Sequence, residues 1–484
     1  MASANDNVTI SCIVNGLELS LVSPSVHSNN CESLFRHANI SVNERSVTSI
    51  IWSCLATIFA CTWVSVHPNI PHPDATEWQI RRQRFLLMIC GLIAPEIIVL
   101  WALRQWIGAR SLVRKMNGKS VSGFTMVHGH FLQMGGFMLY SDETRVGVIE
   151  DENELVAYLQ RSRGTDKFIL PTAAQIQDKS KGDGLSKVLV FGQAGWFIAQ
   201  CISRWAAGLA ITEAELVTLA LAALNGVIYF LWWNKPLNVR YATPVMHHTA
   251  SFHALSNAPG SSILSTSSFP RPSIWPSTIF EVSCYSTEWQ PRIRDDLQDF
   301  IKRILVSSFA ARFLPRLRAQ WIAKQPQHGE RPMRVSLLHT NCDPEDTYSA
   351  TCVASTVAIL FGAIHCIAWN FIFLTPEERT LWRIWSIIIT AAPLILLLRC
   401  FLLYILIRRL STADNLTQLL DRITIFSFNV ARNIRTPSIW ITATLVPVYI
   451  IARCSLLIQS LIALRDLQAT ERAQVNWVDL LPHV

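Results

Sequence analysis

The amino-acid sequence predicts an all-α fold: a polytopic transmembrane helix bundle of about seven spans, plus a basic amphipathic helix on the membrane surface. Half of the 484 residues are hydrophobic and only 16% are charged, whereas an ordinary soluble protein carries about 25% charged residues. The 17 Trp suit a protein with two membrane–water interfaces, where indole rings settle at headgroup level. Seven apolar stretches reach the length of about 20 residues that a membrane-spanning helix needs.

The predicted spans cover residues 47–66, 85–103, 185–203, 213–233, 350–374, 382–407 and 438–463. The third is interrupted by polar residues, among them Lys187 and Gln193, so we expect it to face protein or to lie partly in the membrane interface. No apolar run precedes residue 47, and the first span is therefore expected to act as the targeting signal.

The spans divide the chain into five regions. These are a polar N-terminus expected to be disordered (1–46), a first membrane region of four spans (47–233, with a long loop at 104–184), a Ser- and Pro-rich linker followed by a basic amphipathic helix (234–349, with the helix at 292–324), a second membrane region of three spans (350–463) and a C-terminal tail (464–484).

The net charge of +8 could indicate nucleic acid, but Lys and Arg cluster beside the apolar stretches. This pattern favours anionic lipid headgroups, so membrane lipid is the expected partner and nucleic acid is not. We expect a multi-pass protein of the endoplasmic reticulum, another endomembrane or the plasma membrane. The sequence leaves the oligomeric state open.

The orientation in the membrane also remains open. The second, fourth and sixth connectors are rich in Lys and Arg, which places the N-terminus in the cytosol and the C-terminus on the opposite side if seven spans are present. Asn7-Val8-Thr9 and Asn39-Ile40-Ser41 point the other way, because these glycosylation acceptors are usable only on the luminal side.

Two ionisable residues within predicted spans are candidates for chemistry. Glu96 follows Pro95 in the second span, and Arg453 lies deep in the last one. A charge at this depth is costly, so each residue must find a partner or line a cavity. Glu96 is either a buried acid that donates a proton or half of a structural pair with Arg104 or a basic residue of another helix. Arg453 either completes that pair or binds an anionic group of a substrate.

The fourth predicted span has a defined beginning and end. Thr212 and Glu215 have the spacing of a helix capping box, which leaves Glu213 less well explained. The motif Trp232-Trp233-Asn234-Lys235-Pro236 is typical of a membrane-interface stop with a helix breaker. A ligand-binding role for Asn234 or Lys235 is the alternative.

No cofactor and no metal site are expected. His128-Gly129-His130 is too short a pattern for a metal site, and the histidines at 247, 248 and 253 lie in the linker. The DDxxD pattern at 295–299 is explained by the preference of acids for a helix N-terminus. The 12 Cys include no CxxC pair, and His365 is expected to be a core histidine.

Read together, several motifs resemble a family of large polytopic membrane proteins of filamentous fungi. They are Trp52-Ser53-Cys54-Leu55, His67-Pro68-Asn69-Ile70-Pro71, Ala94-Pro95-Glu96, His128-Gly129-His130-Phe131 with Gly135-Gly136-Phe137, Asp178-Lys179-Ser180-Lys181-Gly182-Asp183, Trp232-Trp233-Asn234-Lys235-Pro236-Leu237, the stretch Gly362–Trp369 and the ending Leu480-Leu481-Pro482-His483-Val484. The resemblance covers about residues 50–484 but indicates little about activity.

Proteins similar to these can be encoded beside secondary-metabolite genes, a setting in which unrelated membrane proteins act as terpene cyclases. By that analogy the resemblance implies a membrane-embedded cyclase or isomerase with a lipophilic, terpenoid substrate, in which a buried acid starts the reaction and aromatic faces stabilise a migrating cation. A transporter or a receptor-like protein without enzymatic activity is the alternative. The candidate residues are Glu96 and Glu213 for catalysis, and Trp101, Trp196, Trp205, Trp369, Arg453 and Lys235 for substrate binding.

Overall fold

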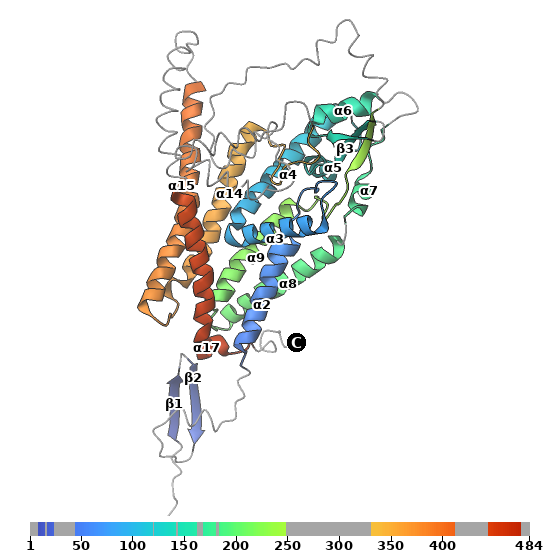
Figure 1. Cartoon of the computed structure of the whole chain (residues 1–484). Helices are drawn as coiled ribbons and strands as arrows, with labels where there is room; N and C mark the ends of the chain where they lie inside the picture. The colour runs from blue at the N-terminus through green and yellow to red at the C-terminus, as the bar shows by residue number, and fades with distance from the viewer. Residues whose placement is uncertain are drawn as a thin grey trace, which may run out of the picture.

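The protein is mostly helical, with a long bundle and a smaller mixed domain at its upper end in the view of Figure 1. The computed structural model describes residues 8–14, 17–23, 44–119, 121–141, 144–161, 168–180, 183–247, 331–411 and 444–475. The predicted amphipathic helix at 292–324, its DDxxD pattern and most of the linker lie outside these residues.

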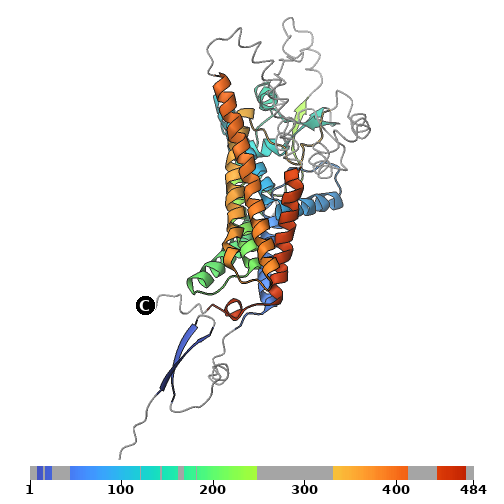
Figure 2. The same ribbon diagram turned by 90° about the vertical axis from the view of Figure 1, so that its left-hand side faces the viewer.

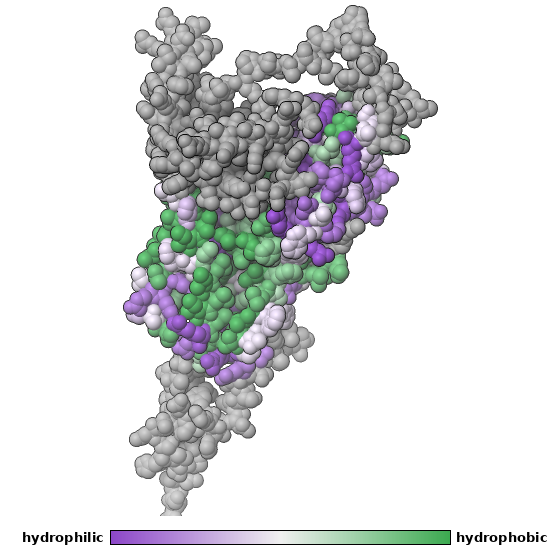
Figure 3. Space-filling model, in the orientation of Figure 1, coloured by the Kyte–Doolittle hydropathy of each residue, from purple (hydrophilic) through white to green (hydrophobic). Residues whose placement is uncertain are grey.

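Within the described residues, six helices are long and apolar enough to cross a membrane. They are α2 (Val47–Phe59) with the π-helical turn η1 (Ala60–Val64), α8 (Asp183–Ala206), α9 (Glu213–Leu231), α14 (Pro344–His365) with the 3₁₀ turn η4 (Cys366–Asn370), α15 (Pro376–Ser411), and a last span over Thr444–Arg465. On the face shown in Figure 3, hydrophobic residues form a band between two polar zones, as expected for a surface in contact with lipid.

The second predicted span, 85–103, is not one straight helix. It is divided between α3 (Glu77–Ile93) and α4 (Pro95–Gly118), which meet at 110°. Pro95 is the first residue of α4, where its missing N–H costs nothing, whereas within a continuous helix its ring would break the hydrogen-bond ladder. In Figure 2 the blue helix α3 lies across the bundle axis while the long red and orange helices stand along it.

The composition of α3 explains why it lies across the bundle. It begins with a capping box formed by Thr76 and Gln79, and it carries Arg81, Arg82 and Arg84. Trp78 is exposed, and so is Phe85 further along the helix. Three arginines within four residues do not suit the hydrocarbon core, but basic and aromatic side chains on one helix suit the membrane surface.

The upper domain is built on the second half of α4. α5 (Met126–Gln133) packs against it so closely that a Cβ on Gly129 would lie 2.9 Å from the carbonyl oxygen of Ala109. The His128-Gly129-His130 motif therefore serves helix packing. The domain is completed by β3 (Phe137–Ser141), β4 (Thr144–Val148), α6 (Glu152–Arg161), α7 (Ala173–Asp178) and β5 (Thr243–His247).

Strands β4, β3 and β5 form one sheet in that order, with β4 antiparallel and β5 parallel to β3. The all-α prediction missed this sheet, and it missed that the linker begins with a strand. A second difference lies in the N-terminal region expected to be disordered, where β1 (Val8–Val14) and β2 (Leu17–Ser23) form an antiparallel hairpin.

Polar contacts join several helix ends at the lower end of the bundle. Arg45, just before α2, forms a two-pronged ion pair with Glu215 in the first turn of α9. The Arg45 backbone N–H donates to the Arg472 carbonyl at 2.8 Å. Arg204, in the last turn of α8, donates to the Ala473 carbonyl at 2.7 Å. The segments that flank the first and the last span therefore lie side by side.

Candidate functional site

Four polar side chains from three helices meet inside the bundle, and we call them the Glu96 centre: Glu96, His365, Tyr449 and Arg453. Glu96 lies in the first turn of α4, and His365 is the last residue of α14. Tyr449 and Arg453 are four residues apart in the last span and so share one face of that helix. The structure thus brings together both predicted intramembrane charges, from segments far apart in the sequence.

Arg453 is fully buried, and its nearest partner is a histidine. Its Nη1 donates to Nε2 of His365 at 2.8 Å. Because a guanidinium can only donate, Nε2 accepts and the His365 proton is on Nδ1, which donates to the Phe361 carbonyl at 2.9 Å. His365 is therefore a neutral, fully bonded core histidine, as predicted, and it orients Arg453.

The break between α3 and α4 favours both charges. Arg453 Nε donates to the carbonyl of Leu92 at 3.4 Å. Leu92 lies in the last turn of α3, where carbonyls lack a helical partner and where the negative end of the helix dipole is located. Glu96 lies in the first turn of α4, at the positive end of that dipole. One interruption of the backbone therefore provides a favourable position for a cation and for a carboxylate.

The hydrogen-bonding capacity of this centre is not used up. The Glu96 carboxyl group interacts with the Tyr449 hydroxyl and with the Arg453 charge. Among the described residues, however, no direct ion pair joins Glu96 to Arg453, and neither Glu96 Oε2 nor Arg453 Nη2 has a hydrogen-bond partner. Arg104 lies about 12 Å further along α4, too far to satisfy Glu96. A carboxyl oxygen and a guanidinium donor thus remain available to a polar group of another molecule.

Aromatic side chains adjoin the Glu96 centre, but they are not the predicted ones. The Arg453 guanidinium lies 4.7 Å from the centre of the Phe361 ring, and buried Trp382 donates from Nε1 to the His365 carbonyl at 3.0 Å. Trp196 and Trp205 are instead 53% and 78% exposed on α8. Trp369 is 37% exposed and is covered by Arg383 near the lower end.

A second buried centre lies around Lys235, four residues beyond the end of α9. Lys235 Nζ donates to the carbonyl of His67 at 2.5 Å, to Oδ1 of Asn69 at 3.1 Å and to Oε1 of Gln105 at 2.8 Å. The rings of Trp101 and Trp232 lie 4.6 and 4.8 Å from the same nitrogen. Two of the predicted binding residues, Lys235 and Trp101, therefore meet, but in this centre and not beside Glu96.

The amide side chains around Lys235 form a closed network. Gln105 Oε1 also accepts from Trp232 Nε1 at 3.0 Å, and Gln105 Nε2 donates to Asn69 Oδ1 at 3.1 Å and to the His339 carbonyl at 3.0 Å. All three ammonium protons of Lys235 thus have acceptors, and the network joins α4, the end of α9, the segment after η1 and the segment before α14. This centre fastens the upper domain to the bundle.

Two buried histidines adjoin this network. Burial lowers the pKa of His130 to about 3, and the nearby charge of Lys235 acts in the same direction. Burial, followed by the Lys235 charge, also lowers the pKa of His67 to about 3. His67 Nδ1 lies 2.6 Å from the Ser65 carbonyl. Its Nε2 and both ring nitrogens of His130 have no hydrogen-bond partner within the described part of the chain.

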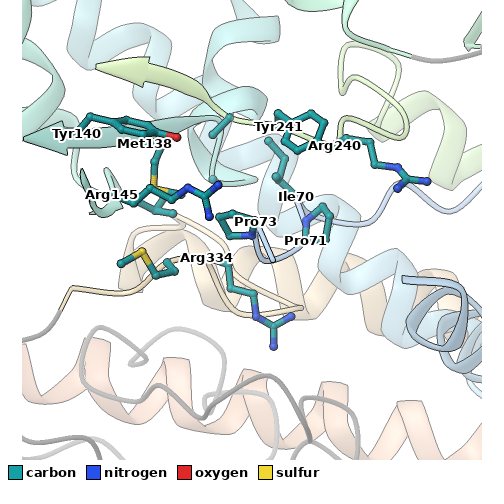
Figure 4. Close-up of a pocket in the computed structure, with 13 residues that line it drawn as sticks. Ile70, Pro71, Pro73, Met138, Tyr140, Arg145, Arg240, Tyr241 and Arg334 are labelled. Carbon is teal, nitrogen blue, oxygen red and sulfur yellow. The ribbon is translucent and has the colours of Figure 1, made fainter. Parts of the chain in front are cut away.

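A pocket opens at the upper end, beside the prolines that precede α3 (Figure 4). Arg145, Arg240 and Arg334 line it together with Tyr140 and Tyr241. Arg145 is paired with Asp74 at 2.7 Å, and Arg240 forms a two-pronged pair with Glu77. Because carboxylates offset two of its arginines, this pocket is a less specific candidate than the two buried centres.

The structure also places the other residues that the sequence analysis singled out. Thr212 and Glu215 do form the predicted capping box, and Glu213 lies buried next to them at the lower end, away from Glu96. No cluster of three or more metal-ligating side chains occurs in the described residues. Sequence reasoning missed Tyr449, Gln105 and Asn69. The spacing of four between Tyr449 and Arg453 was the available signal for the first.

Comparison with known proteins identifies a family and no activity. The model of a family of unknown function (DUF8562) matches residues 20–267 and 345–484, which is most of the chain. The chain therefore belongs to this family. No curated protein and no solved structure matches it. All four residues of the Glu96 centre lie within the matched residues, as does Lys235.

Proposed function

With the family carrying no assigned activity, we propose from the Glu96 centre that this protein is a membrane-embedded enzyme that isomerises or cyclises a lipophilic, terpenoid substrate by acid catalysis. One observation carries the proposal. A carboxyl oxygen of Glu96 and a guanidinium nitrogen of Arg453 both lack partners in the described residues of an apolar bundle. Such groups are expensive to bury unless something else binds to them.

The reaction that suits this arrangement is a proton-initiated isomerisation. Protonated Glu96 donates its proton to an epoxide oxygen or an alkene carbon of the substrate, and the C–O bond or the π bond breaks to leave a carbocation. A neighbouring alkene then forms a new C–C bond with that cation. A carbon next to the final cation loses a proton to the Glu96 carboxylate, which restores the acid and leaves product and substrate with the same atoms.

The other residues have defined parts in this scheme. Arg453 Nη2 can donate to an oxygen of the substrate and fix its position, while His365 orients the guanidinium. The face of Tyr449 can stabilise a passing cation through its ring quadrupole. Glu96 and its neighbours Ile93 and Ile97 are only partly enclosed, which supports entry of an apolar substrate from the lipid.

One observation also favours a transporter. Discontinuous helices with charges at the break are a common way to build a midplane binding site in transporters, and α3 and α4 form such a pair. The two functions make different predictions about metabolites. A transporter moves its substrate unchanged, whereas a cyclase changes the carbon skeleton at constant mass.

The test compares lipophilic extracts of a host that lacks the gene and is complemented with wild type, Glu96→Gln or Glu77→Gln. Glu77 is the matched control because it is an exposed acid at the start of α3, far from the break at Pro95, and pairs at the surface with Arg240. We expect Glu96→Gln to accumulate a less cyclised isomer of a product that wild type and Glu77→Gln both make, with equal protein levels. Full turnover by Glu96→Gln would refute the proposed acid.

A further inference from the structure

The contacts at the lower end of the bundle also determine how the chain crosses the membrane. Arg45 precedes the first span, and its backbone N–H bonds to the carbonyl of Arg472, which follows the last span. An isolated bridge pairs Glu44 with Ala473 in the same place. Two segments joined by backbone hydrogen bonds cannot lie on opposite sides of about 30 Å of hydrocarbon. The number of crossings between them is therefore even.

The same end of the bundle gathers an end of every described span. Arg204 at the end of α8 donates to the Ala473 carbonyl, and Glu215 at the start of α9 pairs with Arg45. Glu378 in the first turn of α15 pairs with Arg465 of the last span at 2.5 Å, and a short turn joins α14 to α15 there. The six helices thus alternate in direction, and the bent α3–α4 pair adds no crossing.

With this topology, the upper domain and all the long connectors share one side of the membrane. The Lys and Arg near the lower ends of the spans are Arg45, Arg204, Arg379, Arg383, Arg465 and Arg472. The upper side has at least twice as many in its described residues alone, among them Arg81, Arg82, Arg84, Arg110, Arg114, Lys115, Lys119, Lys179, Lys187, Arg240, Arg331 and Arg334. The positive-inside rule counts these residues and places the upper side in the cytosol.

We propose that the protein crosses the membrane six times, with residues 44 and 473 on the luminal or external side and with the upper domain and its Lys235 centre in the cytosol. The prediction from seven spans placed the N-terminus in the cytosol and conflicted with the two glycosylation acceptors. With six crossings the conflict disappears. Asn7-Val8-Thr9 and Asn39-Ile40-Ser41 then precede the first span on the side where N-glycosylation occurs.

The experiment maps three epitope tags on the full-length chain: one at the N-terminus, one at the C-terminus and one inserted in the connector 248–330. Cells are treated with a detergent that opens only the plasma membrane, and protease access to each tag is scored by blotting. We expect the connector tag to be digested and both terminal tags to be protected until all membranes are dissolved.

The outcomes separate the two parts of the proposal. Terminal tags on opposite sides would overturn the even number of crossings. Terminal tags that are both digested, with a protected connector tag, would keep six crossings and overturn the orientation. If the protein reaches the plasma membrane, the same comparison is made on intact cells, where the terminal tags are expected to be accessible and the connector tag is not.

Discussion

The Lys235 centre gives the sharpest test of what holds the upper domain to the bundle. Substitution Lys235→Met keeps an unbranched apolar stem and removes the ammonium. Asn69 Oδ1 keeps Gln105 Nε2 as a donor and Gln105 Oε1 keeps Trp232 Nε1. The carbonyl of His67 loses its only donor among the described residues. The substitution therefore leaves one buried acceptor unsatisfied and weakens two others.

The size of the effect follows from these contacts. A hydrogen bond to a charged group contributes about 1.5–3 kcal/mol net, and an orphaned buried acceptor costs about 1–3 kcal/mol. Two of the three acceptors keep a donor, and the apolar methionine stem can be buried without penalty. We therefore expect the free energy of unfolding to fall by about 2–4 kcal/mol, which is less than the summed contributions of three hydrogen bonds to a charged group.

Lys187→Met is the matched control. Lys187 also lies over a tryptophan of the Trp232-Trp233 pair, 4.9 Å from the Trp233 ring, but on the outside of α8. An exposed cation–π contact contributes about 0.5–1 kcal/mol. The assay is unfolding in detergent micelles followed by tryptophan fluorescence. A loss for Lys235→Met no larger than that for Lys187→Met would refute the structural role assigned to the ammonium.

Two further predictions concern charge. Burial lowers the folded-state pKa values of His67, His130 and His339 to about 3, 3 and 4, below the ordinary 6.5, so the stability that these neutral histidines contribute is complete above pH 6.5 and is lost as the pH falls toward 3. Melting curves should therefore show a loss of about 2 kcal/mol per histidine in the free energy of unfolding between pH 7 and pH 5. His130→Gln should remove the share of one histidine from this pH dependence, and an unchanged slope would contradict the prediction. At the lower end, Arg45→Met leaves Glu215 buried without its cation and should lower the free energy of unfolding by about 3–5 kcal/mol in the same assay. The control Arg465→Met breaks a more exposed pair and should lower it by at most about 1 kcal/mol. Equal effects of the two substitutions would be inconsistent with the burial of the Arg45–Glu215 pair.

The sequence predicted where the helices lie better than it predicted the break between α3 and α4 or the pairing of the strands. Apolar length is a local property, so six of the seven predicted spans appear as helices close to their expected positions. The second was predicted as one stretch, whereas the structure divides it between α3 and α4 at Pro95, and Arg81, Arg82 and Arg84 belong to α3 and not to a connector. The strand β5 was missed because its partner β3 lies about 100 residues earlier, and such pairing leaves no local periodicity.

Some residues of the candidate site could be selected from the sequence, and others could not. Buried charges are visible in a sequence because they violate hydropathy, so Glu96 and Arg453 could be selected, and the structure places them in one centre. Their partners are neutral residues such as Tyr449 and Phe361, which look like ordinary core. The predicted substrate-binding tryptophans do not lie beside Glu96, for a related reason. Aromatic content indicates an interface or a core equally well, and Trp196 and Trp205 face outward.

The two buried centres are connected by a single element. α4 carries Glu96 in its first turn and Gln105 nine residues later, so one helix segment about 14 Å long links the acid to the Lys235 network. Trp101, between them, packs at 82° against Trp232. Because α4 is one continuous helix, we expect a loosened Lys235 network to displace its first turn as well, together with the Glu96 carboxyl group near Tyr449 and Arg453. The network that anchors the upper domain is therefore expected to affect the geometry of the proposed acid, through the same helix that contributes Trp101 and Gln105 to that network.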